Sequence, residues 1–217
     1  MSYGYKIGSL PITTVQRLPN YLRLVRELQR EGLEAVSSAR LAETLRVEAI
    51  QIRKDFGYIG ITGRPKTGYR VDELVDVIEQ CLSWNRVQDA ILVGAGNLGR
   101  ALMGYRGFAT HGLRIVAAFD VDPGITGESV NEISVHALSE LAPIARRLKV
   151  RMAILTVSPE AAQAAADKLV DAGIEGIWNF TGKRLSVPDD VIIQDQDIAT
   201  GLAVLSAKLT ARAAPLR

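Results

Sequence analysis

Apolar side chains recur every three or four positions through the first 60 or so residues, which is the spacing of helices that bury one face. The pattern predicts a first helix over residues 11–30, ended by Gly32, and a third helix over roughly 48–56. A second, short helix is expected over 38–45. Its N-cap would be a serine, and Ser38 is favoured over Ser37.

Glycine and proline interrupt this pattern between residues 57 and 71, so no helix is expected there. The basic run Arg64-Pro65-Lys66 is the expected tip of a short hairpin, and residues 72–82 are expected to form a linker helix. Short helices followed by a hairpin are typical of a winged helix-turn-helix. We therefore expect an N-terminal domain of this kind over residues 1–82.

Beyond this segment the pattern changes to short apolar runs that alternate with helical segments. Such alternation predicts a doubly wound parallel sheet with helices on both faces, a Rossmann-like α/β domain over residues 83–196. A last amphipathic helix is expected over 198–211, within a C-terminal segment 197–217. The strands are expected over 90–93, 113–119, 152–157, 176–180 and 191–194, and the helices from 98 onward and over 138–148 and 159–172.

Composition limits the class of protein. Of the 217 residues, 47% are apolar, which fits buried cores rather than disorder. The single cysteine, Cys81, forms no intrachain disulfide and no signal peptide is visible, so a cytoplasmic protein is expected. The apolar runs are too short to cross a bilayer, so no membrane partner is expected. His111 and His136 lack neighbours at metal-ligand spacing, so no metal is expected either.

Charge is unevenly distributed, although the net charge is only +2. The first 70 residues carry a net charge of +6, and the remaining residues carry −4. A basic N-terminal third on an acidic remainder suggests that this third meets a polyanion. A chance gradient of surface charge is the other interpretation.

Residues 94–99, Gly-Ala-Gly-Asn-Leu-Gly, follow an expected strand and open a helix, as a dinucleotide-binding motif requires. The first glycine permits a tight turn, the second lets the backbone approach a pyrophosphate, and the third lets helix and strand pack closely. Asp120 lies 21 residues beyond Gly99, where a carboxylate accepts hydrogen bonds from ribose hydroxyls and repels the 2′-phosphate of NADP. NAD(H) is therefore the expected ligand, with Asp122 as second candidate for the acidic position. A glycine-rich packing turn without ligand is the alternative.

The expected third helix has a polar, basic face formed by Gln51, Arg53 and Lys54. In a helix-turn-helix the second helix of the motif enters the major groove, where Arg and Gln suit base edges and Lys suits phosphates. Arg64 and Lys66 of the hairpin would reach an adjacent minor groove or phosphates. Spacing alone also fits a small helical dimerisation module with a solvated basic face.

Four stretches of sequence form a specific combination. They are Arg-Leu-Pro-Asn-Tyr-Leu-Arg at 17–23; Ser-Ser-Ala-Arg-Leu-Ala at 37–42 followed by Gln-Ile-Arg-Lys-Asp-Phe-Gly-Tyr at 51–58; the glycine motif with its flanks at 93–108 and 118–123; and the segments 153–163 and 172–180. With them the chain closely resembles the Rex family of redox-sensing transcriptional repressors over essentially its whole length.

The resemblance implies a homodimer that binds palindromic operator DNA, with each C-terminal helix swapped onto the partner. It also implies that NADH releases the operator, whereas NAD+ competes for the site without releasing it as well. An Arg–Asp pair that depends on the state of the dimer would match Arg23 and Asp197, near Tyr105. The cofactor site is then expected at Gly94, Ala95, Gly96, Asn97, Leu98, Gly99, Tyr105, Asp120, Asp122 and Thr156, and DNA contacts at Ser38, Gln51, Arg53, Lys54, Tyr58, Arg64 and Lys66.

Two stretches depart from the family's pattern. The wing, usually Gly-Lys-Arg-Gly-Val-Gly-Tyr, reads Gly-Arg-Pro-Lys-Thr-Gly-Tyr at 63–69. The family's Asn-Phe-Ala-Pro becomes Asn-Phe-Thr-Gly at 179–182, at the nicotinamide end of the pocket.

An NAD-dependent dehydrogenase with a helical accessory domain is the main alternative function. It is disfavoured because only about 40 residues follow Phe180 and no catalytic acid or base stands out, so no enzyme is expected. A module that binds coenzyme A is the second alternative, against which Asp120 argues.

Overall fold

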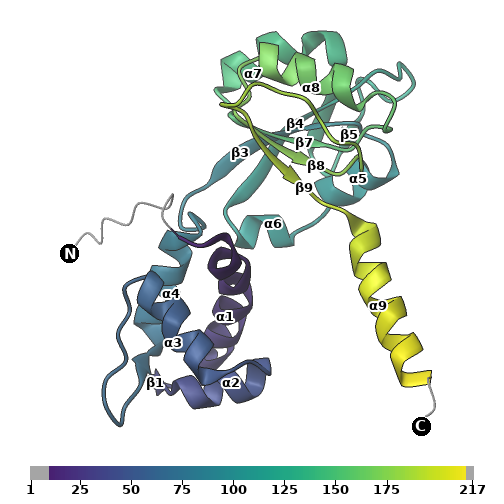
Figure 1. The fold of residues 1–217 in the computed structure, drawn as a ribbon. Coiled ribbons are helices and arrows are strands. Elements are labelled where there is room, and N and C mark those ends of the chain that lie inside the picture. Colours follow the sequence, from purple (N-terminus) through teal and green to yellow (C-terminus); the bar gives the residue numbers. More distant parts are fainter. Residues whose placement is uncertain (1–9, 214–217) are drawn as a thin grey trace. The chain divides into compact units, whose positions relative to one another are not determined.

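The computed structural model describes residues 10–213, which divide into two compact units that meet in sequence between Arg86 and Val87 (Figure 1). The first unit is a small helical bundle with a two-stranded antiparallel sheet. No helix within residues 10–213 is both long and apolar enough to span a membrane. The elements of the first unit are α1 (Ile12–Arg30), β1 (Ala35–Val36), α2 (Ser38–Leu45), α3 (Ala49–Tyr58), β2 (Tyr69–Arg70) and α4 (Val71–Cys81).

Helix α1 forms because its apolar residues lie on one face. Leu18, Leu22 and Val25 are spaced by three or four and are at most 1% exposed. They belong to one apolar cluster with residues of α2, α3 and α4, among them Phe56 and Ile78. The helices expected from the spacing of apolar residues are therefore present.

Two details of the prediction for this unit are wrong. Ser37, not Ser38, caps α2, because Ser37 has extended backbone angles and its Oγ accepts a hydrogen bond from the Arg40 amide at 3.1 Å. Helix α3 also continues through Gly57 to Tyr58. A glycine costs a helix only about 1 kcal/mol relative to alanine, and burial of the neighbouring Phe56 and Ile59 outweighs that cost.

The expected basic hairpin is present between α3 and α4. The backbones of Arg64 and Gly68 exchange two hydrogen bonds, of 2.7 and 2.9 Å, so Pro65 and Lys66 lie in the turn between them. Gly68 has φ of +85°, and a Cβ there would collide with the carbonyl oxygen of Val36. The hairpin, called the wing below, is thus held against β1.

The second unit is built on a seven-stranded sheet with the order β5-β6-β4-β3-β7-β8-β9. Neighbours from β6 to β9 are parallel, and β5 pairs with β6 in antiparallel fashion. The chain runs outward from β3 on one side and returns to β7 on the other, which is the doubly wound order of dinucleotide-binding domains. The strands are β3 (Gln88–Val93), β4 (Leu113–Asp120), β5 (Ser129–Val130), β6 (Ile133–Ala137), β7 (Met152–Leu155), β8 (Gly176–Asn179) and β9 (Ile192–Asp195).

Helices cover both faces of this sheet. Along β3, Ile91 and Val93 belong to an apolar cluster with residues of α7 and α8, whereas Leu92 belongs to a second cluster with Met103 of α5. Alternate residues of a strand point to opposite faces, so the two clusters lie on opposite sides. The doubly wound α/β fold is confirmed. These helices are α5 (Asn97–Met103), α6 (Gly107–Thr110), the 3-10 turn η2 (Leu138–Glu140), α7 (Leu141–Leu148) and α8 (Ala162–Asp171).

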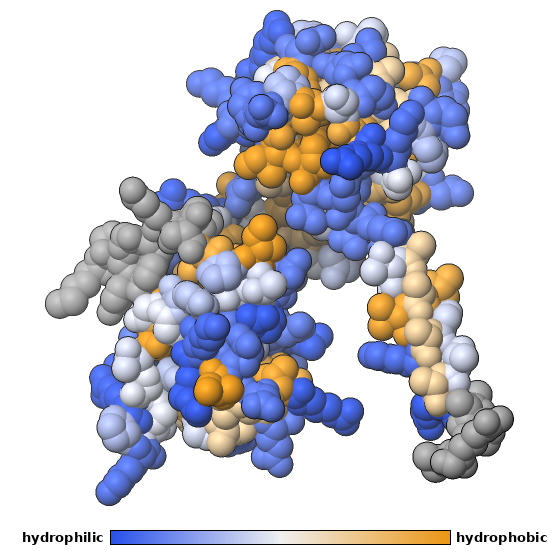
Figure 2. Space-filling view, viewed as in Figure 1, coloured by the Kyte–Doolittle hydropathy of each residue, from blue (hydrophilic) through white to orange (hydrophobic). Residues whose placement is uncertain are grey.

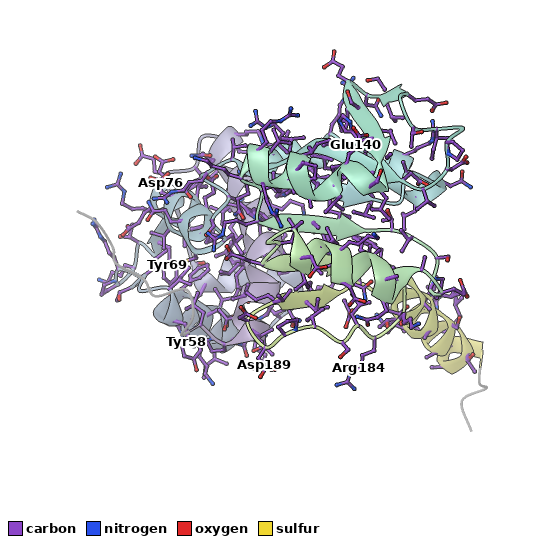
Figure 3. The ribbon with its side chains drawn as sticks, turned by 90° about the horizontal axis from the view of Figure 1, so that it is seen from above. Tyr58, Tyr69, Asp76, Glu140, Arg184 and Asp189 are labelled. Carbon is purple, nitrogen blue, oxygen red and sulfur yellow. The ribbon has the colours of Figure 1, made fainter. Side chains whose placement is uncertain are left out.

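The β5–β6 hairpin was not expected from the sequence. Its two-residue turn, Asn131-Glu132, has positive φ at both positions (49° and 67°) without a glycine to signal it. The helix expected from 159 also begins later, at Ala162. The region 138–148 opens with the η2 turn, where Glu140 (Figure 3) accepts a hydrogen bond from the Ala137 amide at 3.1 Å.

The last element is α9 (Ile198–Ala213), which confirms the expected C-terminal helix. Its leucines are exposed to solvent: Leu202 by 65%, Leu205 by 55% and Leu209 by 58%. Figure 2 shows apolar surface, in orange, along this helix. Within this single chain, α9 has an apolar surface that the described residues do not cover.

Candidate functional site

The turn between β3 and α5 needs glycine at two positions for reasons of packing. Gly94 has φ of +101°, and a Cβ there would lie 2.7 Å from the backbone of Thr156. A Cβ at Gly99 would collide with the carbonyl oxygen of Gly94. Gly96 differs, because a Cβ there would meet nothing within 4 Å. The middle glycine of the motif therefore borders open space, as a backbone approached by a ligand should.

Asp120 lies beside this turn because β4 is the neighbour of β3. Its Oδ2 accepts a hydrogen bond from the Ala95 amide at 2.6 Å, and its Oδ1 accepts from the amides of Val121 and Asp122 at 2.7 and 3.0 Å. Three backbone amides thus hold the carboxylate in place. Asp122 turns onto its own loop instead, where it accepts from the Gly124 amide at 2.8 Å. Of the two candidates, Asp120 is the one placed at the glycine turn.

A cavity of about 450 Å³ opens at this edge of the sheet. It joins the carboxyl ends of β3 and β4 to the loop after β7 and to one face of α8. Among the expected site residues, Gly94, Gly96, Asp120 and Thr156 line it. The sequence did not indicate the rest of its wall, which is mostly apolar: Val93, Val121, Leu138, Val157, Ser158, Ala161, Ala164, Ala165 and Lys168.

The remaining residues expected at the cofactor have other positions. Thr156 supports the glycine turn, since its hydroxyl lies 2.7 Å from the Gly94 carbonyl oxygen and 3.1 Å from that of Val93. Asn97 and Leu98 form the first turn of α5. Tyr105 is 56% exposed and lines a separate cavity of about 720 Å³, where its ring stands edge-on to Phe108 at 5.0 Å.

In the first unit, α3 presents a continuous exposed stripe to solvent. Ile50, Arg53, Lys54 and Tyr58 are all exposed and follow one another at spacings of three, one and four. Lys54 lies over the ring of Tyr58 (labelled in Figure 3), with Nζ 6.0 Å from the ring centroid. The stripe combines hydrogen-bond donors, positive charge and one large aliphatic side chain.

The wing brings more positive charge to the same region. Ser38, Arg53, Arg64 and Lys66 line one hollow of about 540 Å³ between the start of α2, α3 and the wing. Nη1 of Arg53 donates a hydrogen bond to Ser38 Oγ at 3.3 Å. The structure therefore brings four of the expected DNA-contacting residues together.

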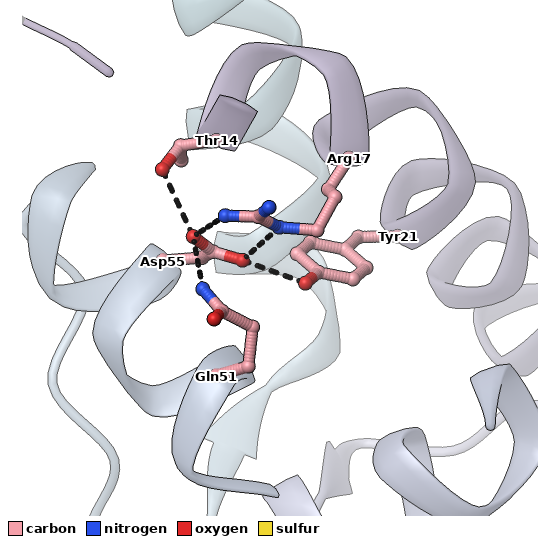
Figure 4. A network of polar contacts seen from close by, with 5 residues as sticks. All are labelled: Thr14, Arg17, Tyr21, Gln51 and Asp55. Carbon is pink, nitrogen blue, oxygen red and sulfur yellow. Dashed lines mark hydrogen bonds and ion pairs between the residues drawn. The ribbon is translucent and has the colours of Figure 1, made fainter. Parts of the chain in front are cut away.

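Behind α3 lies a buried carboxylate that the sequence did not single out. Asp55 is fully buried and accepts hydrogen bonds from Thr14 and Tyr21 of α1 at 2.9 and 2.7 Å (Figure 4). Arg17 donates two hydrogen bonds to the same carboxylate, from Nε and from Nη2, each at 2.7 Å. Burial alone would raise the pKa of Asp55, but the hydrogen bonds from Arg17, Tyr21 and Thr14 outweigh it and the pKa lies below its ordinary value. Asp55 therefore ties α3 to α1 as an ionised group.

Gln51 belongs partly to this network. Its Nε2 donates to Asp55 Oδ1 at 3.1 Å, and the side chain is half-buried at the edge of the exposed stripe. An ionised carboxylate only accepts hydrogen bonds, so the amide is oriented with its nitrogen toward Asp55. The expected base-reading role of Gln51 is thus limited to the part of the amide that the network leaves accessible.

The three residues expected at a dimer switch belong to different units. Arg23 is exposed on α1 of the first unit. Asp197, in the second unit, lies just before α9, where Oδ1 accepts from the Ala199 amide at 2.8 Å and Oδ2 accepts from the Thr200 hydroxyl at 3.1 Å. Asp197 thus forms an N-cap of α9.

Among residues 10–213, no group of His, Cys, Asp or Glu is arranged to hold a metal ion.

A winged helix-turn-helix unit with a basic outer stripe, followed by a Rossmann unit with an open glycine turn, defines a class of DNA-binding proteins that carry a dinucleotide-binding domain. Curated proteins of this class are similar to almost the whole chain. The "Redox-sensing transcriptional repressor Rex" of Treponema denticola is 45% identical over 95% of this chain and 98% of its own. Its counterpart from Bacteroides thetaiotaomicron is 39% identical over 92% of this chain and 91% of its own. The chain belongs to the Rex family.

Solved structures agree with this assignment. The Rex-family repressor RSP, in a crystal structure with NAD+ and operator DNA, has a TM-score of 0.88 and 33% identity over 94% of each chain. RSP with NADH has a TM-score of 0.86 over 94% of this chain and 96% of its own. Two family models also match, "Putative DNA-binding protein N-terminus" over residues 9–57 and "CoA binding domain" over residues 85–182.

Proposed function

We propose that this chain is a redox-sensing transcriptional repressor whose first unit binds operator DNA and whose second unit binds NADH or NAD+. One observation carries the proposal: a single chain combines an open glycine turn beside Asp120 with a basic stripe on α3 next to the wing. Membership of the Rex family supports it, as do the RSP structures with NAD+, NADH and operator DNA.

We infer that the cavity receives the adenosine half of a dinucleotide. The pyrophosphate would pass over Gly96, where the backbone is open, and the ribose hydroxyls would donate to Asp120. The planar base would enter between Val121 and the alanine face of α8. Asp120 would repel a phosphate on this ribose, so NAD(H) is favoured over NADP(H).

Asp120→Ala should weaken NADH binding, because the ribose hydroxyls of NADH lose their hydrogen-bond acceptor. It should also reduce the preference for NADH over NADPH, because the negative charge that repels the 2′-phosphate of NADPH is removed. Titration calorimetry with both cofactors measures this. Asp122→Ala is the matched control, since its carboxylate lies two residues away and faces its own loop. If wild type already binds NADPH as well as NADH, the role proposed for Asp120 is wrong.

The family model's description raises coenzyme A as a second ligand. Coenzyme A also contains a pyrophosphate, but its adenosine ribose has a 3′-phosphate that a carboxylate at Asp120 would repel. Competition between coenzyme A and NADH, followed by NADH fluorescence, separates the two. Displacement of NADH by micromolar coenzyme A would favour the second ligand.

Arg53→Ala should weaken operator binding by about 1–3 kcal/mol, as expected for an arginine that reads a guanine. Lys54→Ala should weaken binding to all sequences and lower the salt dependence by about one phosphate contact. Fluorescence anisotropy at several salt concentrations distinguishes the two effects. Arg30→Ala, at the exposed end of α1, is the control. Unchanged binding of both variants would mean that a helix other than α3 enters the groove.

A homodimer is part of the proposal. The exposed leucines of α9 need an apolar partner, and a second copy that receives this helix by domain swapping would supply it. The proposed domains are the winged helix (1–82), the NAD(H)-binding domain (83–196) and the swapped C-terminal segment (197–217). We place the protein in the cytoplasm and assign it no enzymatic activity, in keeping with repressors as its relatives.

Selection of binding sites from random DNA, followed by titration with NADH and with NAD+, tests the proposed function. We expect a palindromic operator that is released by NADH and retained better with NAD+. Steady oxidation of NADH by the protein with a carbonyl substrate would instead favour the dehydrogenase alternative. Selection of no sequence would contradict a repressor.

Asp197→Asn tests the switch. The amide oxygen of asparagine can still accept the hydrogen bond from the Ala199 amide, and its nitrogen can donate to the Thr200 hydroxyl, but the side chain lacks the charge that would pair with Arg23 of the partner. NADH affinity should stay within a few-fold, whereas the loss of operator affinity on saturation with NADH should become smaller. Operator affinity is measured with and without NADH in both proteins. An identical ratio of affinities in wild type and variant would exclude Asp197 from the switch.

A further inference from the structure

The exposed stripe of α3 contains one residue that neither charge nor hydrogen bonding explains. Ile50 lies in the first turn of the helix and is 63% exposed. Val47, three residues earlier and just before the helix, is 36% exposed. The other exposed side chains of the stripe, Arg53, Lys54 and Tyr58, all have polar ends. An aliphatic side chain therefore occupies the start of a face whose remainder is polar.

Ile50 is not needed for packing within its own unit. The core side of α3 is formed by Ile52, Phe56 and the buried Asp55, each 0% exposed. Asp55 holds this side against α1 through hydrogen bonds to three residues of that helix. The helix therefore keeps its rotation, and Ile50 stays on the outer face.

The surroundings of Ile50 indicate what it would contact. Arg53 and Lys54, one turn further along the same stripe, provide positive charge for a polyanion. Glu48, the exposed N-cap residue two positions before Ile50, carries a negative charge that would repel phosphates from this end of the helix. Base edges rather than the sugar-phosphate backbone are then the favoured neighbours. On those edges in the major groove, the apolar group is the C5-methyl of thymine.

We propose that Ile50 reads a thymine in each operator half-site through contact with its C5-methyl group, with Val47 beside it. The inference rests on the proposed function and adds a base identity to it. In helix-turn-helix proteins the N-terminal residues of the recognition helix contact base edges, and Ile50 has that position. Burying one methyl group against an aliphatic side chain should change affinity by about fourfold for each half-site.

The experiment uses the selected operator and replaces its thymines one position at a time by deoxyuridine, which differs only by lacking the methyl group. Binding of the full-length protein is measured by fluorescence anisotropy for wild type, Ile50→Ala and the control Ile12→Ala. Ile12 is a comparable residue of the same unit, 74% exposed at the start of α1. We expect one position per half-site where deoxyuridine weakens wild type and Ile12→Ala about fourfold but leaves Ile50→Ala unchanged.

Equal responses of wild type and Ile50→Ala at every position would overturn the inference and leave the proposed function intact. Selection of no DNA sequence by wild type would overturn both. Alanine favours helix more than isoleucine does and position 50 is exposed, so Ile50→Ala should fold. Matching circular dichroism and unchanged binding to non-specific DNA check this. If Ile50→Ala changes the mass of the assembly in light scattering but not the deoxyuridine response, Ile50 contacts a protein and the inference is wrong.

Discussion

Gly96→Val is expected to abolish NADH binding while the second unit stays folded. The added side chain meets no protein atom within 4 Å of its Cβ, so the turn can accept it. The same open space is where the pyrophosphate would approach the backbone, and an isopropyl group there excludes it. Gly94 and Gly99 do not allow such a test, because a Cβ at either position collides with backbone atoms.

Calorimetry with NADH measures the loss, and the thermal unfolding curve shows that the fold is retained. Gly176→Val is the matched control. Gly176 begins β8, at the end of the sheet opposite the glycine turn, and a Cβ there also meets nothing within 4 Å. This control should bind NADH as wild type does. Wild-type affinity of Gly96→Val would show that the cofactor does not pass over this turn.

Asp55→Ala should lower the free energy of unfolding of the first unit by about 3 kcal/mol or more. The substitution leaves the guanidinium of Arg17 and the hydroxyls of Thr14 and Tyr21 without their shared acceptor. Thr14 and Tyr21 are themselves buried, so water does not readily replace the carboxylate. Operator affinity should fall as well, because α3 loses its attachment to α1.

Urea unfolding of the full-length protein, followed by circular dichroism, measures this effect. Glu79→Ala is the control in the same unit, where a partly exposed carboxylate accepts from Arg26 at 2.8 Å. Glu79→Ala should lower the free energy of unfolding by no more than about 1 kcal/mol. If Asp55→Ala loses no more stability than Glu79→Ala, burial does not strengthen the hydrogen bonds of Asp55 and the prediction is wrong.

The effect should also depend on pH in a defined direction. Because the pKa of Asp55 is lower in the folded than in the unfolded protein, its charge stabilises the fold above its unfolded pKa of about 4. This contribution is lost as the pH falls through the folded pKa. The difference in stability between wild type and Asp55→Ala should therefore be constant near neutral pH and shrink in acid.

The sequence predicted elements whose signal is local. The apolar runs 90–93 and 152–157 predicted buried strands, of which the second ends earlier, at Leu155, and the stripe of α1 predicted a helix with one buried face. The β5–β6 hairpin was missed because its strands are short and its turn, Asn131-Glu132, adopts positive φ without glycine. Ser37 and Ser38 are chemically equivalent, so only the backbone conformation decides which one caps α2.

The residues of the candidate sites also divide into those with a local signal in the sequence and those without one. Gly94 and Gly99 are predictable because the turn itself leaves no room for a side chain there, and Gly96 because the motif needs an open backbone beside the ligand. The cavity wall at Leu138 and along α8 could not be predicted, since alanine and leucine at those positions look like ordinary core residues. Asp55 was missed for a related reason. A carboxylate is tolerated within an apolar stripe only when another helix supplies its partners, and the sequence does not show how α1 packs against α3.

The bonds between Asp55 and α1 have a mechanical consequence. Thr14, Arg17 and Tyr21 span two turns of α1, so they resist rotation as well as separation of the two helices. A force applied to α1 at Arg23, less than two turns beyond Arg17, therefore displaces the outer face of α3 with it. If α3 binds DNA as proposed, a displacement of α1 would change the alignment of α3 with the operator without unfolding either helix.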